Sequence, residues 1–145
     1  MRVQGAYVLA GFLALCVCLT SSAMAEIRFE NASRSTVGYL DSSGRIEDAS
    51  RSTKGYVSDD KVEDSGRSTI GYISDDGRIE DASRSTLGFV NSNGSVENAS
   101  RSTIGYINSD GRIENGSRST IGYANGYDSS HVNAVACFWF FFFTP

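Results

Sequence analysis

The sequence has 145 residues, and its 13 basic and 17 acidic side chains give a net charge of −4. That length is enough for one domain and short for two. The negative balance argues against nucleic acid and against an anionic membrane surface as partners.

The first residues predict a secretory signal peptide. Arg2 provides a positive start, Ala6 to Leu19 is an apolar run, and Ala23-Met24-Ala25 is a small-x-small cleavage pattern. The apolar run is shorter than the roughly 20 residues that a spanning helix needs, so we expect no transmembrane anchor. We assign residues 1–25 to the signal peptide and expect an exported protein, periplasmic, outer-surface or secreted.

The cysteines add little chemistry. Leu15 and Val17 precede Cys16 and Cys18, whereas a lipid-attachment signal needs a small residue there, so we exclude a lipoprotein. Cleavage would leave Cys137 alone, without an intramolecular disulfide partner. Its apolar neighbours predict a buried, inert sulfur.

One short phrase is repeated along the rest of the chain. Arg-Ser-Thr begins at six positions, 17, 16, 17, 17 and 17 residues apart: Arg34, Arg51, Arg67, Arg84, Arg101 and Arg118. A fixed short period indicates one supersecondary unit that cannot bury its own apolar face. We therefore predict a repeat domain over residues 26–127.

Each unit has the pattern of a β-hairpin. Ser68 to Ile73 is rich in β-branched and aromatic residues, Ser74-Asp75-Asp76-Gly77 has turn chemistry, and Arg78 to Asp81 is again strand-like. The copy at Ser58-Asp59-Asp60 lacks the glycine, which accounts for the single spacing of 16. A surface loop tolerates such a deletion and a packed strand does not.

Comparison of the copies predicts the core. Two sites are apolar in every copy: Leu40, Val57, Ile73, Val90, Ile107 and Ala124 in one strand, and Ile46, Val62, Ile79, Val96 and Ile113 in the other. The site after threonine holds Lys54 in one copy, which predicts a partly exposed face. Strand alternation places the aromatic residue two positions later on that same face. This residue is Tyr39, Tyr56, Tyr72, Phe89, Tyr106 or Tyr123, and Phe89 shows that the hydroxyl is not required.

A glycine precedes this aromatic in all six copies: Gly38, Gly55, Gly71, Gly88, Gly105 and Gly122. Glycine weakens a strand interior, so its repetition predicts close approach of other chain segments around an axis. The leading strand Ile27 to Glu30 and the trailing strand Ser119 to Tyr123 are unmatched halves. We expect them to pair and to close the units into a ring without exposed edges.

The repeat RSTIGYISDDGRIEDAS resembles that of the five-fold β-flower proteins, small exported bacterial proteins with hairpins around a pseudo-five-fold axis. The resemblance covers about Ile27 to Tyr123. It implies an all-β fold of hairpin repeats of about 17 residues around a five-fold or six-fold axis. It implies no catalytic residues.

Residues 128–145 break the pattern and end in six consecutive aromatic residues: Phe138, Trp139, Phe140, Phe141, Phe142 and Phe143. Such a run aggregates if it stays in water. A membrane anchor would need about twice the apolar length. A sorting signal and an intermolecular contact remain alternatives, and we favour a strand or plug that fills the apolar surface of the ring.

The candidate chemical sites are weak. The acidic loops, with Asp75, Asp76, Glu80 and Asp81, vary between copies where calcium ligands need fixed spacing, so we predict solvated turns and no metal. His131 is the sole histidine, and no motif for a serine triad surrounds it. Four Asn-x-Ser triplets follow from composition. No cofactor is predicted.

The sequence therefore predicts no specific activity. We expect an exported, non-enzymatic structural or interaction module that binds a glycan or cell-wall polymer weakly and at many sites. The alternative is a self-assembling, fibre-forming surface protein with the aromatic tail as its adhesive end.

Overall fold

The computed structural model describes residues 25–145. These residues form twelve short strands: β1 (Ile27–Asn31), β2 (Thr36–Leu40), β3 (Arg45–Asp48), β4 (Thr53–Val57), β5 (Lys61–Asp64), β6 (Thr69–Ile73), β7 (Arg78–Asp81), β8 (Thr86–Val90), β9 (Ser95–Asn98), β10 (Thr103–Ile107), β11 (Arg112–Asn115) and β12 (Thr120–Asn125). Three short helical segments follow: η1 (Ser129–His131), α1 (Val132–Ala136) and η2 (Cys137–Phe141). The predicted signal peptide lies outside the described residues, apart from Ala25.

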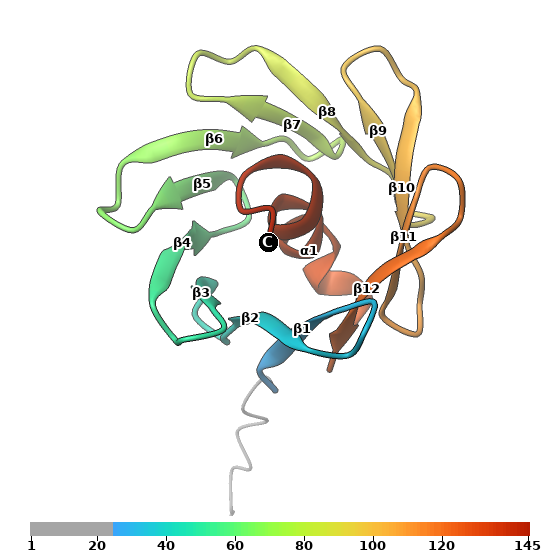
Figure 1. Cartoon of the computed structure of the whole chain (residues 1–145). Coiled ribbons are helices and arrows are strands. Elements are labelled where there is room, and N and C mark those ends of the chain that lie inside the picture. Colours follow the sequence, from blue (N-terminus) through green and yellow to red (C-terminus); the bar gives the residue numbers. More distant parts are fainter. Residues whose placement is uncertain (1–24) are drawn as a thin grey trace, which may run out of the picture.

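All twelve strands are antiparallel to their neighbours and form one closed barrel. The barrel closes where β1 pairs with β12, with Phe29 opposite Ala124, so the expected pairing of the two end strands is confirmed. Figure 1 shows the hairpins as petals around a central helical coil. There are six petals, β1–β2, β3–β4, β5–β6, β7–β8, β9–β10 and β11–β12, which decides between the five-fold and six-fold alternatives.

Two kinds of turn alternate around the ring. The turns between petals follow β2, β4, β6, β8 and β10, and four of them end in a glycine with φ between 80° and 82°. The turns at the petal tips end instead in the arginine of Arg-Ser-Thr, with φ between 65° and 68°. In each tip an Asn or Asp accepts two backbone hydrogen bonds, as Asp48 does from Ser50 and Ser52 at 2.8 and 3.0 Å.

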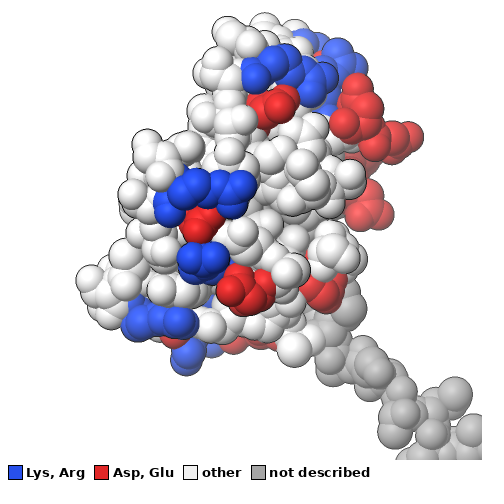
Figure 2. Space-filling view, turned by 90° about the vertical axis from the view of Figure 1, so that its right-hand side faces the viewer, with Lys and Arg blue, Asp and Glu red and all other residues white. Residues whose placement is uncertain are grey.

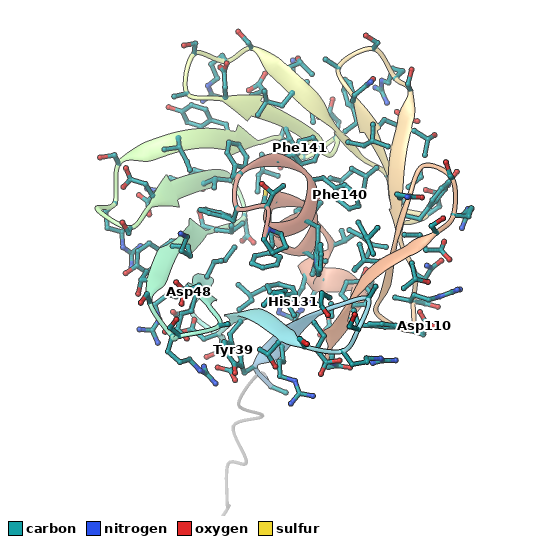
Figure 3. The ribbon with its side chains drawn as sticks, viewed as in Figure 1. Tyr39, Asp48, Asp110, His131, Phe140 and Phe141 are labelled. Atoms are coloured by element: carbon teal, nitrogen blue, oxygen red, sulfur yellow. The ribbon has the colours of Figure 1, made fainter. Side chains whose placement is uncertain are left out.

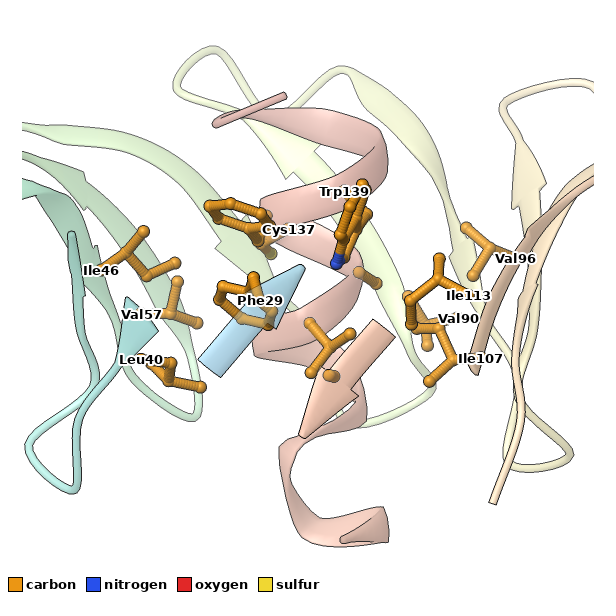
Figure 4. Close-up of a cluster of buried hydrophobic side chains, with 14 of the residues drawn as sticks. Phe29, Leu40, Ile46, Val57, Val90, Val96, Ile107, Ile113, Cys137 and Trp139 are labelled. Carbon is orange, nitrogen blue, oxygen red and sulfur yellow. The ribbon is translucent and has the colours of Figure 1, made fainter. Parts of the chain in front are cut away.

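The two predicted apolar sites of each repeat point into the ring. Ile46, Val62, Ile79, Val96 and Ile113 are fully buried, and Phe29 takes the same place in β1. The second set, from Leu40 to Ala124, is at most 8% exposed. Figure 4 shows members of both sets arranged around the central helix. The core is therefore formed by the same two positions of every petal.

The residue after threonine is partly exposed, as predicted, but it does not share a face with the aromatic residue two positions later. The pairing register shifts by one residue next to each repeat glycine, as between Ile46 and Glu47 where β3 pairs with β4. A bulge of this kind interrupts strand alternation. The apolar residues at this site, Val37, Ile70, Leu87, Ile104 and Ile121, consequently pack against the core, while the aromatic two positions later lies on the outer surface.

The aromatic tail lies at the centre of the ring and is helical rather than a strand (Figures 1 and 3). Phe138 and Trp139 are 2% and 7% exposed, and Phe140 to Phe143 are half-buried. We call residues 138–143 the plug. Phe138 stacks on Phe29 with ring centroids 4.0 Å apart, and Trp139 meets both rings edge-on. The plug thus packs directly on β1, the strand that closes the barrel.

The plug places one aromatic ring on the repeat glycine of each petal. A β-carbon added at each glycine would touch one ring: Gly38 meets Phe138, Gly122 meets Trp139, Gly105 meets Phe140, Gly88 meets Phe141, Gly71 meets Phe142 and Gly55 meets Phe143. Consecutive plug residues therefore contact neighbouring petals. Six plug residues complete one circuit of the ring, whereas roughly 3.6 residues complete one turn of an α-helix. The helix of the plug is correspondingly wider than an α-helix. The amides of Phe142 and Phe143, five and six residues along the chain, both donate to the Cys137 carbonyl, at 2.9 and 3.3 Å.

Candidate functional site

The outer surface carries one three-residue cluster on each repeat, which we call the arginine–aromatic belt. The aromatic residue of one strand faces a glutamate across the sheet, as Tyr39 faces Glu47. The tip arginine four residues after that glutamate folds back over the aromatic ring, and Arg51 lies 3.4 Å from the Tyr39 centroid. The other stacked pairs are equally close, at 3.3 to 3.5 Å: Arg34–Tyr123, Arg67–Tyr56, Arg84–Tyr72, Arg101–Phe89 and Arg118–Tyr106.

Each stacked arginine is also bonded to its glutamate. The Nη1 atom donates to the carboxylate at 3.1 to 3.3 Å in all six copies. A second cation lies against the carboxylate in five copies, as Lys61 does at 2.8 Å from Glu63. Hydrogen bonds from Lys61, and then from Arg67, hold the pKa of the Glu63 carboxyl below its usual value. The fifth copy has Ser95 at this place, and the Glu97 side chain is 20% exposed against 5% to 11% in the others.

The stack explains why arginine holds a left-handed backbone conformation at six petal tips. A side chain with a β-carbon is disfavoured there, and the glycine turns adopt the same region without strain. The conformation brings the guanidinium over the aromatic ring and within reach of the glutamate. Cation–π contact and ion pairing, worth about 0.5–1 kcal/mol each at exposed sites, offset the backbone cost of about 1–2 kcal/mol.

Charge is divided between two zones of the surface. Eleven of the twelve basic side chains among residues 25–145 belong to the belt or lie beside its glutamates as second cations, and only Lys54 lies elsewhere. Six aspartates lie instead in the turns between petals: Asp41, Asp59, Asp60, Asp75, Asp76 and Asp110. Figure 2 shows this separation, with basic side chains over one side of the visible face and acidic side chains protruding from the other.

A groove lies at the end of the ring that carries these acidic turns. It has a volume of about 530 Å³ and runs between the first three such turns and the segment from Ser130 to Ala134. A second hollow of about 360 Å³ continues past Asp75 and Asn133. Its lining is mainly serine, aspartate and asparagine, with apolar contributions from Leu40, Val57 and Ala134. This groove could seat a small polar molecule, but unlike the belt it is not repeated.

His131 lies in this groove without the geometry of a catalytic triad. Its Nδ1 atom is 3.1 Å from Asp128 and 3.2 Å from the Ser130 hydroxyl. A triad needs the acid on one ring nitrogen and the nucleophile on the other. Here both lie on Nδ1, and hydrogen bonds from Ser130 hold the pKa of Asp128 below its usual value. The cluster caps the start of η1 instead.

Comparison with known families agrees with this architecture. The family model described as 5-fold beta-flower protein matches residues 26–144, which include both the petals and the plug. The chain belongs to the 5-fold beta-flower family. Neither the curated proteins nor the solved structures gave a significant match. Membership suggests a non-enzymatic repeat protein, and this β-flower has six petals where the family description specifies five-fold symmetry.

Two further findings concern the described part of the β-flower. Within residues 25–145, no helix is long and apolar enough to cross a membrane. The same residues contain no group of three or more histidine, cysteine, aspartate or glutamate side chains placed to hold a metal ion. Cys137 is buried, as predicted, and burial raises the pKa of its thiol.

The structure separates the residues singled out from the repeat. The six glycines lie beneath the plug, and the adjacent aromatic residues lie outside, in the belt. Sequence reasoning missed the contact between arginine and aromatic residue. One signal was present, because a glutamate precedes each tip arginine by four residues: Glu30, Glu47, Glu63, Glu80, Glu97 and Glu114. A constant acid–base spacing in every copy indicates a conserved contact within the repeat.

Proposed function

We propose that this protein is an exported, non-enzymatic interaction module whose ring presents one binding surface six times. The ligand is a glycan or cell-wall polymer, held weakly at each copy and more firmly by several together. The belt carries this proposal, because it repeats an exposed guanidinium at every petal, with side chains 50% to 62% exposed. Repeated weak contacts to a polymer raise the overall affinity without new chemistry.

The form of the ring supports binding over fibre formation. Every described strand is paired on both sides, so the ring offers no free strand edge to a second copy. The aromatic tail that would serve as the adhesive end is packed on the six repeat glycines. A fibre would require the barrel to open or the plug to leave it.

A glycan array and pull-downs with insoluble polysaccharides test the proposal. We expect retention by at least one polymer and weak or no binding to its short oligomers, because the affinity depends on several petals acting together. Blank results in both assays would refute the binding function. Electron microscopy of the same preparation addresses the alternative, since filaments in place of a single species of defined mass would favour assembly.

A further inference from the structure

The stacked arginines leave one edge of each guanidinium free. In the belt, one face of the group lies on the aromatic ring and one Nη1 hydrogen bond goes to the glutamate. Among residues 25–145, the Nη2 atoms of five of the six have no hydrogen-bond partner: Arg34, Arg67, Arg84, Arg101 and Arg118. Stacking and pairing hold these groups in fixed positions, so a ligand would not have to order a long side chain.

The sixth arginine shows what this edge binds. Glu26, just before β1, places its carboxylate across Nη1 and Nη2 of Arg51, with Nη2 donating at 3.0 Å. The contact joins residues 25 positions apart, whereas the Glu47 contact on the same guanidinium is local. A fork of two parallel hydrogen bonds is the preferred geometry between arginine and a carboxylate. Glu26 therefore occupies on Arg51 the edge that is open on the other five.

Taking the proposed function as its basis, we propose that the belt binds an acidic polysaccharide, with sugar carboxylates on the open edges of Arg34, Arg67, Arg84, Arg101 and Arg118. Each carboxylate would pair with one guanidinium as Glu26 pairs with Arg51. Successive petals present the same edge around the outside of the ring, so one chain can engage several. Glu26 acts as an internal competitor that closes the sixth site.

The distribution of charge supports an acidic ligand despite the negative total. The belt and the second cations beside its glutamates comprise eleven basic side chains. Against them stand the six glutamates and three tip aspartates, Asp48, Asp64 and Asp81, and the remaining acids lie mainly in the turns between petals. At physiological salt, charges more than about 8 Å away are largely screened. A polymer at the belt therefore experiences a local excess of positive charge.

The test measures binding of the purified protein to alginate, a polymer of uronic acids, by biolayer interferometry. Dextran serves as the neutral polymer and single-stranded DNA as the phosphate polymer. We expect alginate to bind more tightly than either, and its binding to weaken as salt is raised. We expect Arg84→Gln to weaken alginate binding about threefold and Arg84→Gln with Arg118→Gln about tenfold, given a few-fold contribution for each exposed contact.

Two matched variants distinguish binding at the belt from a nonspecific effect of net charge. Lys54→Gln removes the same charge as Arg84→Gln from the one basic residue away from the belt and its second cations, and we expect it to leave affinity within about twofold. Glu26→Gln removes the competing carboxylate from the Arg51 edge and leaves the petals unchanged, and we expect binding to strengthen about twofold or more. Circular dichroism melts confirm that each variant is folded.

Several outcomes would overturn the inference. An unchanged or weaker affinity for Glu26→Gln, or equal losses for Lys54→Gln and Arg84→Gln, would mean that the edges are not the site. Tighter binding of DNA would make the ligand a phosphate polymer instead. Equal binding of dextran and alginate would leave the proposed glycan function intact and refute the carboxylate contact. No binding to any polysaccharide would refute both.

Discussion

The contact between each repeat glycine and one plug ring can be tested at Gly71. A β-carbon there would lie 2.8 Å from Cε1 of Phe142, closer still to its Cζ, and 2.6 Å from the Glu80 carbonyl oxygen. Alanine is otherwise favoured over glycine in a strand interior by roughly 0.5–1 kcal/mol. Overpacking of a filled core costs about 1–3 kcal/mol, and here both neighbours are rigid. We expect Gly71→Ala to lower the free energy of unfolding by about 2 kcal/mol.

A second substitution identifies which ring is responsible. Phe142→Leu removes the ring atoms that the new β-carbon would meet, so the double variant should lose less stability than the two single losses together. A coupling of about 0.5–1 kcal/mol is typical for residues in contact. Phe141 packs on Gly88 instead, so Phe141→Leu should combine additively with Gly71→Ala. Urea unfolding followed by circular dichroism measures all five variants.

Gly66 provides the control for the substitution itself. It lies in a petal-tip turn, where an added β-carbon would meet only the Asp64 side chain, at 3.3 Å. We expect Gly66→Ala to change stability by no more than about 0.5 kcal/mol. The reasoning would be refuted if Gly71→Ala were as harmless as Gly66→Ala. Equal rescue by Phe141→Leu and Phe142→Leu would refute the assignment of one ring to one petal.

Three further predictions concern the plug, the belt and acid stability. Deletion of Cys137 to Pro145 removes the plug rings and the Phe138–Phe29 stack, and we expect the cooperative thermal transition seen by circular dichroism to disappear. An unchanged Tm would show that the plug is dispensable. Arg84→Ala should lower the Tm more than Arg84→Gly, because both lose the Tyr72 stack and only alanine keeps the backbone strain at φ 66°. A lower Tm for Arg84→Gly than for Arg84→Ala would refute the role of backbone strain. The pKa values of Glu63, Glu114 and Asp128 are lowered in the folded protein, so their stabilisation is complete above the unfolded values and is lost as pH falls through the folded ones. Thermal melts should therefore show a Tm that drops as pH is lowered below about 4.5, and a Tm that rises on acidification would contradict this sign.

Much of the fold follows from comparison of the repeats with one another. Alternation of apolar residues predicted the two buried sets, because a strand shows one face to the core at every second residue. The shortened turn near Asp59 identified the loop, since a deletion is tolerated only where the chain is exposed. The unmatched end strands indicated closure because an open sheet would leave two unpaired edges.

The features that the sequence did not reveal depend on relations between petals. The bulge next to Gly38 arises from the hydrogen-bond register between two strands, and the pattern of residues within one strand does not reveal that register. The stack of Arg51 on Tyr39 joins residues 12 positions apart and needs a left-handed arginine that propensity disfavours. The helical form of the plug could not be read from its pattern either, because six consecutive aromatic residues show no periodicity.

The number of aromatic rings in the plug equals the number of petals in the ring. Six petals each present one glycine, and six consecutive aromatic residues each cover one of them. Phenylalanine fills five of these places, and tryptophan fills the place in the petal that contains β12, where Ala124 replaces the larger aliphatic residues of the other copies. A seventh petal would therefore leave a glycine uncovered, and a seventh ring would lack a place to pack. The number of repeats and the number of consecutive aromatic residues must therefore agree. Each of them independently indicates a ring of six petals.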